Sequence, residues 1–456
     1  MSAADSDFPQ FNDENFAVEN GQRPTVFRWV VFALGCNVSL MLYLHRYTFA
    51  LIKPALIEEF GLDKIQLGYL DSTFSICYTL FQIPLGALSD FAGVHLMLTG
   101  MIVFWSIGFG MHAWATRIPI LYIARGILGI GQSAVFASLN RLTRTWFPLA
   151  NRSTMQGILG VFAGRMGGLT SYMLVGFLVL GIWKMEWRLA VYLLAGGGLC
   201  LAVLFAIFFR NSPRRHPLVN KEEADLIEGD DPLPDAGAAN GSSRMSKREI
   251  LDRMSVRSVL NLFSLNLQSI LSTLADNIYS SWIPLFLFEV HAMKFTEMGF
   301  YSALPLLGGA IGGVLGGWLN DYFIRNTGNR RWSRSLVALT GKGLAAFCLL
   351  AALLTSYDNP YAFCTMLFFV KLFGDWSLTT SWSTVTDIGG RTTATVFAFN
   401  NSVAGIAAII APTLYGFVAE EWGWRWMFII ACAAYALCAL SWLLIDCTIP
   451  ILKDDD

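Results

Sequence analysis

Charged residues are scarce in this chain. Asp, Glu, Lys and Arg make up 14% of the 456 residues, whereas hydrophobic residues make up 55% and the mean hydropathy is +0.51. A soluble protein of this length has no interior large enough to hide that much apolar surface. The composition therefore predicts an all-α membrane protein whose helices cross the bilayer many times.

Motifs for enzymatic chemistry are also missing. The sequence has no Gly-x-Ser-x-Gly elbow, no phosphate-binding P-loop, no metal-spaced cluster among its five histidines and no Cys-x-x-Cys among its eight cysteines. We therefore expect no enzymatic activity, no metal and no cofactor. The net charge of −1 comes without a Lys/Arg-rich run, so nothing indicates nucleic-acid binding.

Apolar runs of about 20 residues, long enough to cross a bilayer as a helix, recur along the chain. They form two sets of six, separated by a polar stretch, which predicts twelve transmembrane helices in two six-helix bundles. The expected helices are 27–46, 67–89, 95–115, 118–140, 155–181, 187–209, 258–288, 297–319, 335–356, 361–386, 394–418 and 425–447.

These runs also divide the chain into expected domains. They are an N-terminal tail (1–26), an N-terminal bundle (27–209), a linker (210–257), a C-terminal bundle (258–447) and a C-terminal tail (448–456). The prolines and acidic run of the linker predict a flexible middle and partly helical ends. Lys and Arg concentrate in the segments that face inward when both termini are cytoplasmic, so the positive-inside rule predicts that orientation in the cell's inner (plasma) membrane. We expect a monomer in the lipid bilayer.

The two halves of the chain resemble each other. Gly86 to Asp90 follows the second expected helix, and Gly317 to Asp321 follows the eighth, both with Gly-x-x-x-Asp spacing. Trp-Arg opens the sixth helix at Trp187 and the twelfth at Trp424. Two six-helix repeats joined by a long linker are typical of rocker-switch transporters.

The repeated Gly-x-x-x-Asp segment resembles the loop signature of the major facilitator superfamily. Further segments narrow the resemblance to its anion:cation symporter branch, which includes bacterial galactonate and hexuronate transporters, vesicular glutamate transporters and sialin. These segments are Tyr43-Leu-His-Arg46, Ile57-Glu-Glu-Phe-Gly61, Tyr78 to Pro84, Asn140-Arg141 and Trp146-Phe-Pro148. The resemblance covers nearly the whole chain and implies a secondary transporter that moves an organic anion by alternating access.

Two arginines lie at or within apolar runs. Arg46 follows the run 29–44, and Arg165 lies inside the run 157–181. A charge at that depth in a bilayer costs at least a few kcal/mol. Because guanidinium stays charged and offers a fork to carboxylate or phosphate, we predict that Arg46 and Arg165 hold an anion, with help from Arg125 near the outer start of the fourth helix. The alternative is that each arginine bonds a carbonyl group or extends to the membrane surface.

Other polar and aromatic residues complete the expected substrate site. The resemblance implies contacts on both halves, and helical spacing puts several of them on shared faces. The expected contacts are Tyr43, His45, Tyr78, Gln132, Thr379, Ser381, Trp382 and Asn401. Trp282 and Trp382 are expected to stack in the cavity.

Two of these positions depart from the family pattern. His45 stands where the family commonly has an acidic residue, and Gln132 stands where it has a glutamate. The resemblance implies that those carboxylates couple transport to protons, so proton coupling, facilitation and anion exchange all stay open. His45 is expected to be neutral beside Arg46 and to donate a hydrogen bond.

Three other acids are candidates for proton coupling: Asp71, Asp276 and Asp375. Asp71 is expected near the outer mouth of the second helix, as a proton site or as a solvated helix end. Asp276 is expected either to accept a proton or to pair with an N-half arginine, and Lys371 and Asp375 have the spacing of an intrahelical pair. An alternative function is export of zwitterionic or cationic compounds recognised by Asp276 and Asp375.

The loop carboxylates Asp90 and Asp321 are expected to act in conformational gating. The resemblance implies that each caps a neighbouring helix and pairs with loop arginines. The first loop has His95 where an arginine is usual, whereas Arg325, Arg330 and Arg331 follow the second loop. We therefore expect the stronger latch in the C-terminal half.

Overall fold

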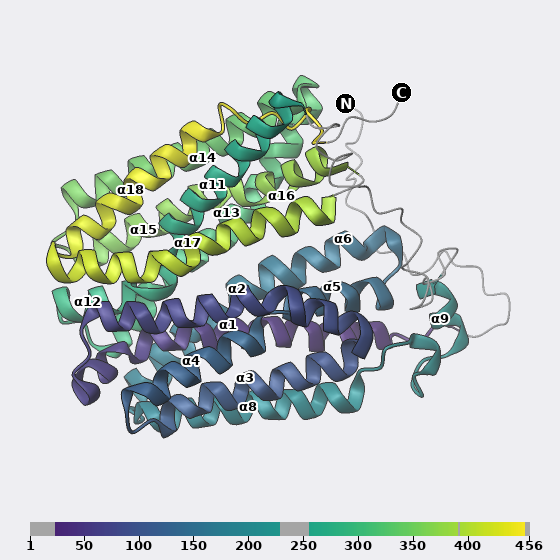
Figure 1. Cartoon of the computed structure of the whole chain (residues 1–456), viewed down its shortest axis with the longest axis horizontal. Helices are drawn as coiled ribbons and strands as arrows, with labels where there is room; N and C mark the ends of the chain where they lie inside the picture. The colour runs from purple at the N-terminus through teal and green to yellow at the C-terminus, as the bar shows by residue number, and fades with distance from the viewer. Residues whose placement is uncertain (1–22, 229–254, 391–392, 452–456) are drawn as a thin grey trace, which may run out of the picture.

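The computed structural model describes residues 23–228, 255–390 and 393–451. Within these ranges the chain is helical, with short connections and no strand. The helices from the first half of the chain lie beside those from the second half, and the two sets run roughly parallel along the long axis (Figure 1). The all-helical prediction is confirmed.

The first half begins with three long helices, α1 (Phe27–Phe60), α2 (Lys64–Ala92) and α3 (Val94–Trp114). The expected fourth and fifth helices are each interrupted. Their parts are α4 (Ile118–Gln132), α5 (Val135–Trp146), α6 (Leu149–Gly157), the π-helix η2 (Ile158–Phe162), α7 (Ala163–Thr170) and the π-helix η3 (Ser171–Ile182). The set ends with α8 (Trp187–Phe208), which is followed by η4 (Pro213–Arg215) and α9 (Lys221–Glu228) in the linker.

The second half repeats the pattern with a broken first helix and a broken fourth one. Its elements are α11 (Val256–Ser281), α12 (Ile283–His291), α13 (Phe295–Thr327), α14 (Arg330–Thr355), α15 (Pro360–Gly374), α16 (Trp376–Gly389), α17 (Thr393–Glu421) and α18 (Trp424–Ser441). Eleven helical segments of the described residues are long and apolar enough to cross a membrane. The twelfth long segment is α2, with 29 residues.

The first helix is much longer than its apolar run predicts. It was expected to end at residue 46, but α1 continues to Phe60 and ends at Gly61, whose left-handed backbone (φ 64°) allows its N–H to bond the Ile57 carbonyl. Arg46 and Lys53 interrupt the hydropathy signal, yet the residues between them are mostly buried. Arg46 therefore lies in the interior of the helix instead of at its end.

The two halves approach most closely near the end where α1 passes into α2. Glycines allow the backbones to meet there, since a Cβ at Gly176 would lie 2.9 Å from the Cα atom of Gly299. On the other flank, Ser72 of α2 donates to the Ile409 carbonyl of α17 at 2.6 Å. Lys64 also pairs with Glu420 at 2.9 Å.

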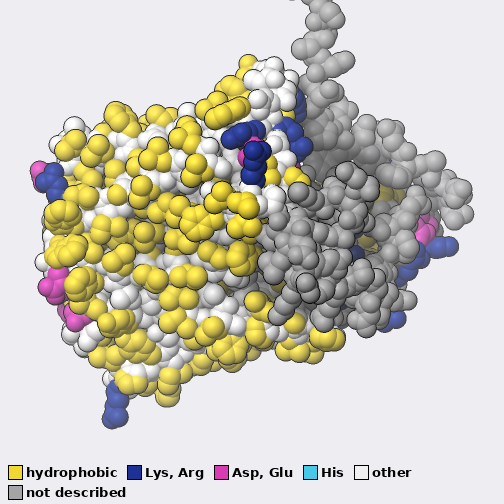
Figure 2. Space-filling view, turned by 45° about the horizontal axis from the view of Figure 1, so that its top comes forward, with side chains coloured by type: hydrophobic (Ala, Val, Ile, Leu, Met, Phe, Trp, Pro, Cys, Tyr) yellow, Lys and Arg dark blue, Asp and Glu magenta, His cyan; other side chains and the backbone are white. Residues whose placement is uncertain are grey.

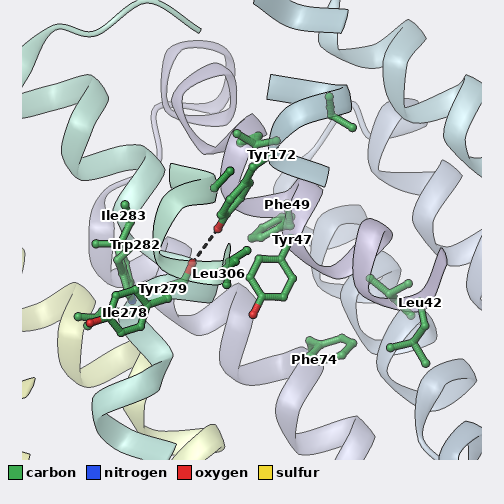
Figure 3. Close-up of a cluster of buried hydrophobic side chains, with 14 of the residues drawn as sticks. Leu42, Tyr47, Phe49, Phe74, Tyr172, Ile278, Tyr279, Trp282, Ile283 and Leu306 are labelled. Carbon is green, nitrogen blue, oxygen red and sulfur yellow. Dashed lines mark hydrogen bonds between the residues drawn. The ribbon is translucent and has the colours of Figure 1, made fainter. Parts of the chain in front are cut away.

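Aromatic packing continues across this interface. Figure 3 shows Tyr47, Phe49 and Tyr172 facing Tyr279 and Trp282 of the second half. The Tyr172 hydroxyl donates to the Tyr279 carbonyl at 2.7 Å. The two halves thus share a buried core, which sets the relative position of the cavity walls in this conformation.

The outer surface matches a protein in lipid. Hydrophobic side chains cover most of the described surface in Figure 2, and charged side chains gather toward its two ends. Large apolar residues such as Phe347 (67% exposed) and Leu354 (70%) are well exposed. An apolar band between charged margins is the expected form of a bilayer-spanning surface.

The start of the linker is anchored to the first helix. Glu223 of α9 is fully buried and accepts from the backbone N–H groups of Phe27 at 3.1 Å and Arg28 at 2.9 Å. This carboxylate satisfies free donors at the N-terminus of α1. The expected helical start of the linker is therefore present, whereas its expected flexible middle falls mainly on 229–254, outside the described residues.

Candidate functional site

A cavity of about 330 Å³ lies between the two halves of the molecule. Its walls come from α1, α2, α4, α7, α11 and α17. The lining residues are Tyr43, Arg46, Tyr47, Asp71, Phe74, Ser75, Arg125, Arg165, Thr273, Asp276, Asn277, Ser280, Ser281, Ala408 and Pro412. Every one of the three predicted arginines therefore reaches the same cavity.

Arg46 is held by aromatic rings and one amide. Its guanidinium carbon lies 5.1 Å from the ring centre of Tyr43, 4.9 Å from Phe74 and 5.0 Å from Tyr78. Its Nε and Nη2 donate to Oε1 of Gln132 at 3.3 and 3.2 Å. Gln132 is itself fixed, because its amide nitrogen donates to the Leu42 carbonyl at 3.2 Å.

Among the described residues, Arg46 has no carboxylate partner. Gln132 occupies the side of the guanidinium that carries Nε, and no carboxylate of the described residues pairs with the rest of the group. The aromatic residues, including Tyr78, whose hydroxyl also interacts with Arg46, compensate part of the charge but supply no negative charge. The guanidinium therefore keeps a charged edge available to an anion.

A second group of charges joins α1, α2 and α4. Lys53 is fully buried and donates to Asp71 at 2.8 Å and to the Ser281 carbonyl at 2.7 Å. Arg125 donates to the other oxygen of Asp71 and, at 3.2 Å, to the Leu70 carbonyl. We call Lys53, Asp71 and Arg125 the triad.

The triad corrects two predictions. Asp71 was expected near the mouth of a helix, but it is only 6% exposed and bridges two cations. Lys53 was not predicted at all, because the first helix was expected to end before it. Its signal was the isolated lysine in an apolar stretch just before Pro54.

A third group of charges crosses from one half to the other. Arg165 of α7 forms an ion pair with Asp375 at 2.7 Å. Lys371 lies between the two acids, 2.6 Å from Asp375 and 2.7 Å from Asp276, and the Tyr435 hydroxyl donates to Asp276 at 2.6 Å. We call Arg165, Lys371, Asp276 and Asp375 the quartet.

The quartet changes the assignment of the inter-bundle ion pair. Asp276 was considered as the partner of an N-half arginine, but its cation is Lys371 of its own half, and Asp375 makes the contact with Arg165. The predicted intrahelical pair of Lys371 and Asp375 is present as well. Asp375 separates α15 from α16, and its carboxylate reaches Arg165 of α7.

Several expected contacts do not line the cavity. His45 is buried between α3 and α8, where it stacks on Phe109 at 4.2 Å and donates to the Leu194 carbonyl at 3.1 Å. This agrees with its expected role as a donor but removes it from the substrate site. The ring centre of Trp282 lies 3.9 Å from Nζ of Lys53, and Trp282 does not line the cavity.

The expected contacts of the C-terminal half are also displaced. Trp382 is 39% exposed and packs edge-on against Phe397, while Ser381 accepts from Gln268 at 2.9 Å. Thr379 packs near Gly317, and Asn401 is exposed. The resemblance is loose in this half, and the polar lining comes instead from Thr273, Asn277 and Ser280 of α11.

The expected latch of the C-terminal half has different partners. Asp321 is exposed and has no ion pair within the described ranges. Arg330 pairs with Asp387 at 2.7 Å, and Arg331 pairs with Asp446 at 3.2 Å. The side chain of Asp90 falls outside the described residues, so its gating role stays a prediction.

Comparison with known proteins now identifies the fold. The sequence profile of the Major Facilitator Superfamily matches residues 36–388 and 267–450. The chain belongs to the major facilitator superfamily. It is therefore a membrane transporter and not an enzyme, as the missing catalytic motifs predicted.

Curated relatives match over most of their length. A probable sulfoacetate transporter of Cupriavidus necator is 28% identical over 94% of this chain and 95% of its own. The hexuronate transporter of Escherichia coli is 27% identical over 86% of both chains. A probable galactarate/D-glucarate transporter of Bacillus subtilis is 24% identical over 88% of both.

Solved structures agree on the fold. A bacterial homologue of the human lysosomal transporter Spinster superimposes with a TM-score of 0.72 at 18% identity, covering 92% of this chain and 98% of its own. The D-xylose-proton symporter gives 0.71 at 16% identity with the same coverage. Within the described ranges, no group of three or more His, Cys, Asp or Glu residues is arranged to hold a metal ion.

The inter-bundle ion pair is testable by a double-mutant cycle of Arg165→Gln and Asp375→Asn. We expect the two substitutions to be non-additive by about 1–3 kcal/mol, because each one removes the same contact. The measurement is denaturant unfolding of the purified protein, followed by tryptophan fluorescence. Arg165→Gln combined with the distant Asp446→Asn is the control and should be additive; additivity in both cycles contradicts a direct ion pair.

Proposed function

We propose that this chain is a secondary transporter that moves a small organic anion across the cell's inner membrane by alternating access. Both halves line the central cavity, as that mechanism requires of a substrate site. Three curated relatives carry names of transporters for organic acids, namely sulfoacetate, hexuronate and galactarate or glucarate. Those names support the substrate class without naming the substrate.

The observation that carries the proposal is the free edge of Arg46. A guanidinium in a cavity of low dielectric is costly unless an anion or a set of acceptors compensates it. Gln132 supplies one neutral acceptor and three rings surround the group, yet no protein carboxylate reaches it within the described residues. A substrate carboxylate, sulfonate or phosphate would complete the site.

The alternative of a cationic or zwitterionic cargo has less support. It requires Asp276 and Asp375 to be available, but Lys371 lies within 2.7 Å of both acids. Arg165 pairs with the other oxygen of Asp375, and the Tyr435 hydroxyl donates to the same Asp276 oxygen that Lys371 contacts. A cation entering the cavity would have to displace these protein partners and then face Arg46.

Alternating access also requires a contact between the halves that can exchange. The pair of Arg165 and Asp375 satisfies hydrogen-bond distance but not hydrogen-bond angle, since Oδ2 of Asp375 has no aligned donor. Arg165 also lines the cavity, so an anion bound nearby competes with Asp375 for the positive charge of its guanidinium. In this proposal, anion binding weakens one inter-bundle contact and thereby lowers the barrier to rocking.

The neutral residue Gln132 bears on whether anion transport is coupled to protons. Because Gln132 cannot ionise, the charge of Arg46 stays available at every physiological pH. The carboxylates Asp71, Asp276 and Asp375 each have a cation partner in this state. We therefore propose facilitation or anion exchange in preference to proton symport through the acid positions of the family.

Arg46→Ala is expected to lower anion uptake into proteoliposomes about a hundredfold. The reason is that a bidentate contact to a charged group contributes about 3 kcal/mol to binding. The matched control is Arg330→Ala, whose side chain is about half exposed far from the cavity and shares Asp387 with Arg334. Full uptake by the Arg46 variant, with normal incorporation into the membrane, contradicts the anchor role.

Gln132→Glu is expected to make uptake depend on acid. The new carboxylate would pair with Arg46 at neutral pH and compete with the substrate, whereas its protonated form would restore a neutral acceptor. Uptake at pH 7.5 should fall about tenfold or more and recover as the pH is lowered. Gln132→Met is the control, with a loss that acid does not reverse; identical pH profiles of Gln132→Glu and the wild type overturn this account of coupling.

A further inference from the structure

The charges around the cavity do not balance. In the quartet, the cations Arg165 and Lys371 face the carboxylates Asp276 and Asp375, so its formal charge is zero. These four side chains satisfy one another across the two halves. The cavity's excess charge must therefore come from elsewhere.

The triad carries one uncompensated positive charge. Asp71 is its single carboxylate and is shared between Lys53 and Arg125. The remaining partners of the two cations are the neutral carbonyls of Ser281 and Leu70. Without Lys53, Asp71 and Arg125 would form a neutral pair.

Arg46 adds a second positive charge, because it has no carboxylate partner in the described part of the chain. A further buried lysine, Lys342, lies behind the quartet and donates to Ser272 at 2.9 Å, without lining the cavity. Its charge adds to the excess of positive formal charge in this region. The excess near the cavity is therefore at least two.

An unused donor marks where a second anionic group can bind. Arg125 is only 2% exposed and lines the cavity, yet its Nη1 has no hydrogen-bond partner within the described structure. A buried guanidinium nitrogen without an acceptor is costly, and an anion in the cavity would remove that cost. This observation is independent of the charge count.

The two arginines are close enough to hold one small molecule. The guanidinium carbons of Arg46 and Arg125 each lie 4.9 Å from the ring centre of Phe74, so they are separated by at most twice that distance. The cavity of about 330 Å³ corresponds to roughly ten water molecules. A compact molecule fits both limits.

We propose that the substrate is a small organic dianion whose two acidic groups are separated by a few bonds. One group binds Arg46, the other binds Arg125, and Lys53 sets the preference for the second charge by keeping the triad cationic. This inference rests on the proposed function, since it specifies the anion that the same cavity takes. Lys53 acts here as a specificity-determining residue that need not touch the substrate.

The test compares acids of equal chain length that differ by one charge. Succinate and butyrate, malonate and propionate, and glutarate and valerate are titrated at pH 7.5 into the purified full-length protein by calorimetry. We expect the best dianion to bind at least about tenfold more tightly than its monoanion. Lys53→Met should reduce that ratio to below about twofold.

A compensating variant separates charge from structure. Lys53→Met/Asp71→Asn removes one cation and one carboxylate, so Arg125 regains its full charge and the preference for dianions should return. A merely structural role of Lys53 would not be rescued in this way. Lys342→Met, the same substitution at a buried lysine outside the cavity lining, should keep the wild-type ratio.

The outcomes distinguish the two proposals. Equal binding of dianions and monoanions by the wild type overturns the dianion inference but leaves an anion transporter. No binding of any acid overturns the proposed function as well. If Lys53→Met does not fold, the wild-type ratio and the double variant still decide, and loss of the preference in Lys342→Met contradicts the assignment to Lys53.

Discussion

The centre of this structure depends on one constraint, which is that buried cationic side chains need partners that compensate their charge. Five cations lie at or near one cavity between two helix bundles, namely Arg46, Lys53, Arg125, Arg165 and Lys371. The carboxylates that pair with them are Asp71, Asp276 and Asp375. Burying such groups is tolerable only when each charge finds a partner. At the centre, helices of both halves contribute the groups that pair with the buried cations.

The compensation differs from group to group, and this divides the cavity into parts. The quartet is neutral and joins the bundles, the triad fixes α1 against α2 and α4 while reaching the Ser281 carbonyl, and Arg46 relies on rings and Gln132. We propose that the substrate supplies the anionic partner that Arg46 lacks among the described residues. In the proposed function, binding and rocking are linked because Arg165, which lines the cavity, also pairs with Asp375 of the other half.

The sequence predicted the fold class and three arginines that line one cavity, because hydropathy and isolated charges are local signals. It could not predict that α1 extends to Phe60, since Arg46 and Lys53 break the apolar run that marks a helix. The contact partners of individual side chains were harder to predict from the sequence. Asp375 instead of Asp276 pairs with Arg165, and His45 bonds the Leu194 carbonyl, because both outcomes depend on how the helices are rotated against each other. The C-half residues Thr379, Ser381, Trp382 and Asn401, expected as contacts, do not line the cavity in this structure.

Among the described residues Arg46 has no carboxylate partner, and we propose that a substrate anion completes its site. A structure of the protein with a bound dicarboxylate such as succinate tests this most directly. The account predicts one carboxylate within hydrogen-bond distance of the Arg46 fork, with Gln132 still bonded to its Nε side and the second carboxylate near Nη1 of Arg125. A ligand bound away from Arg46, with the guanidinium still lacking an acidic partner, would contradict it.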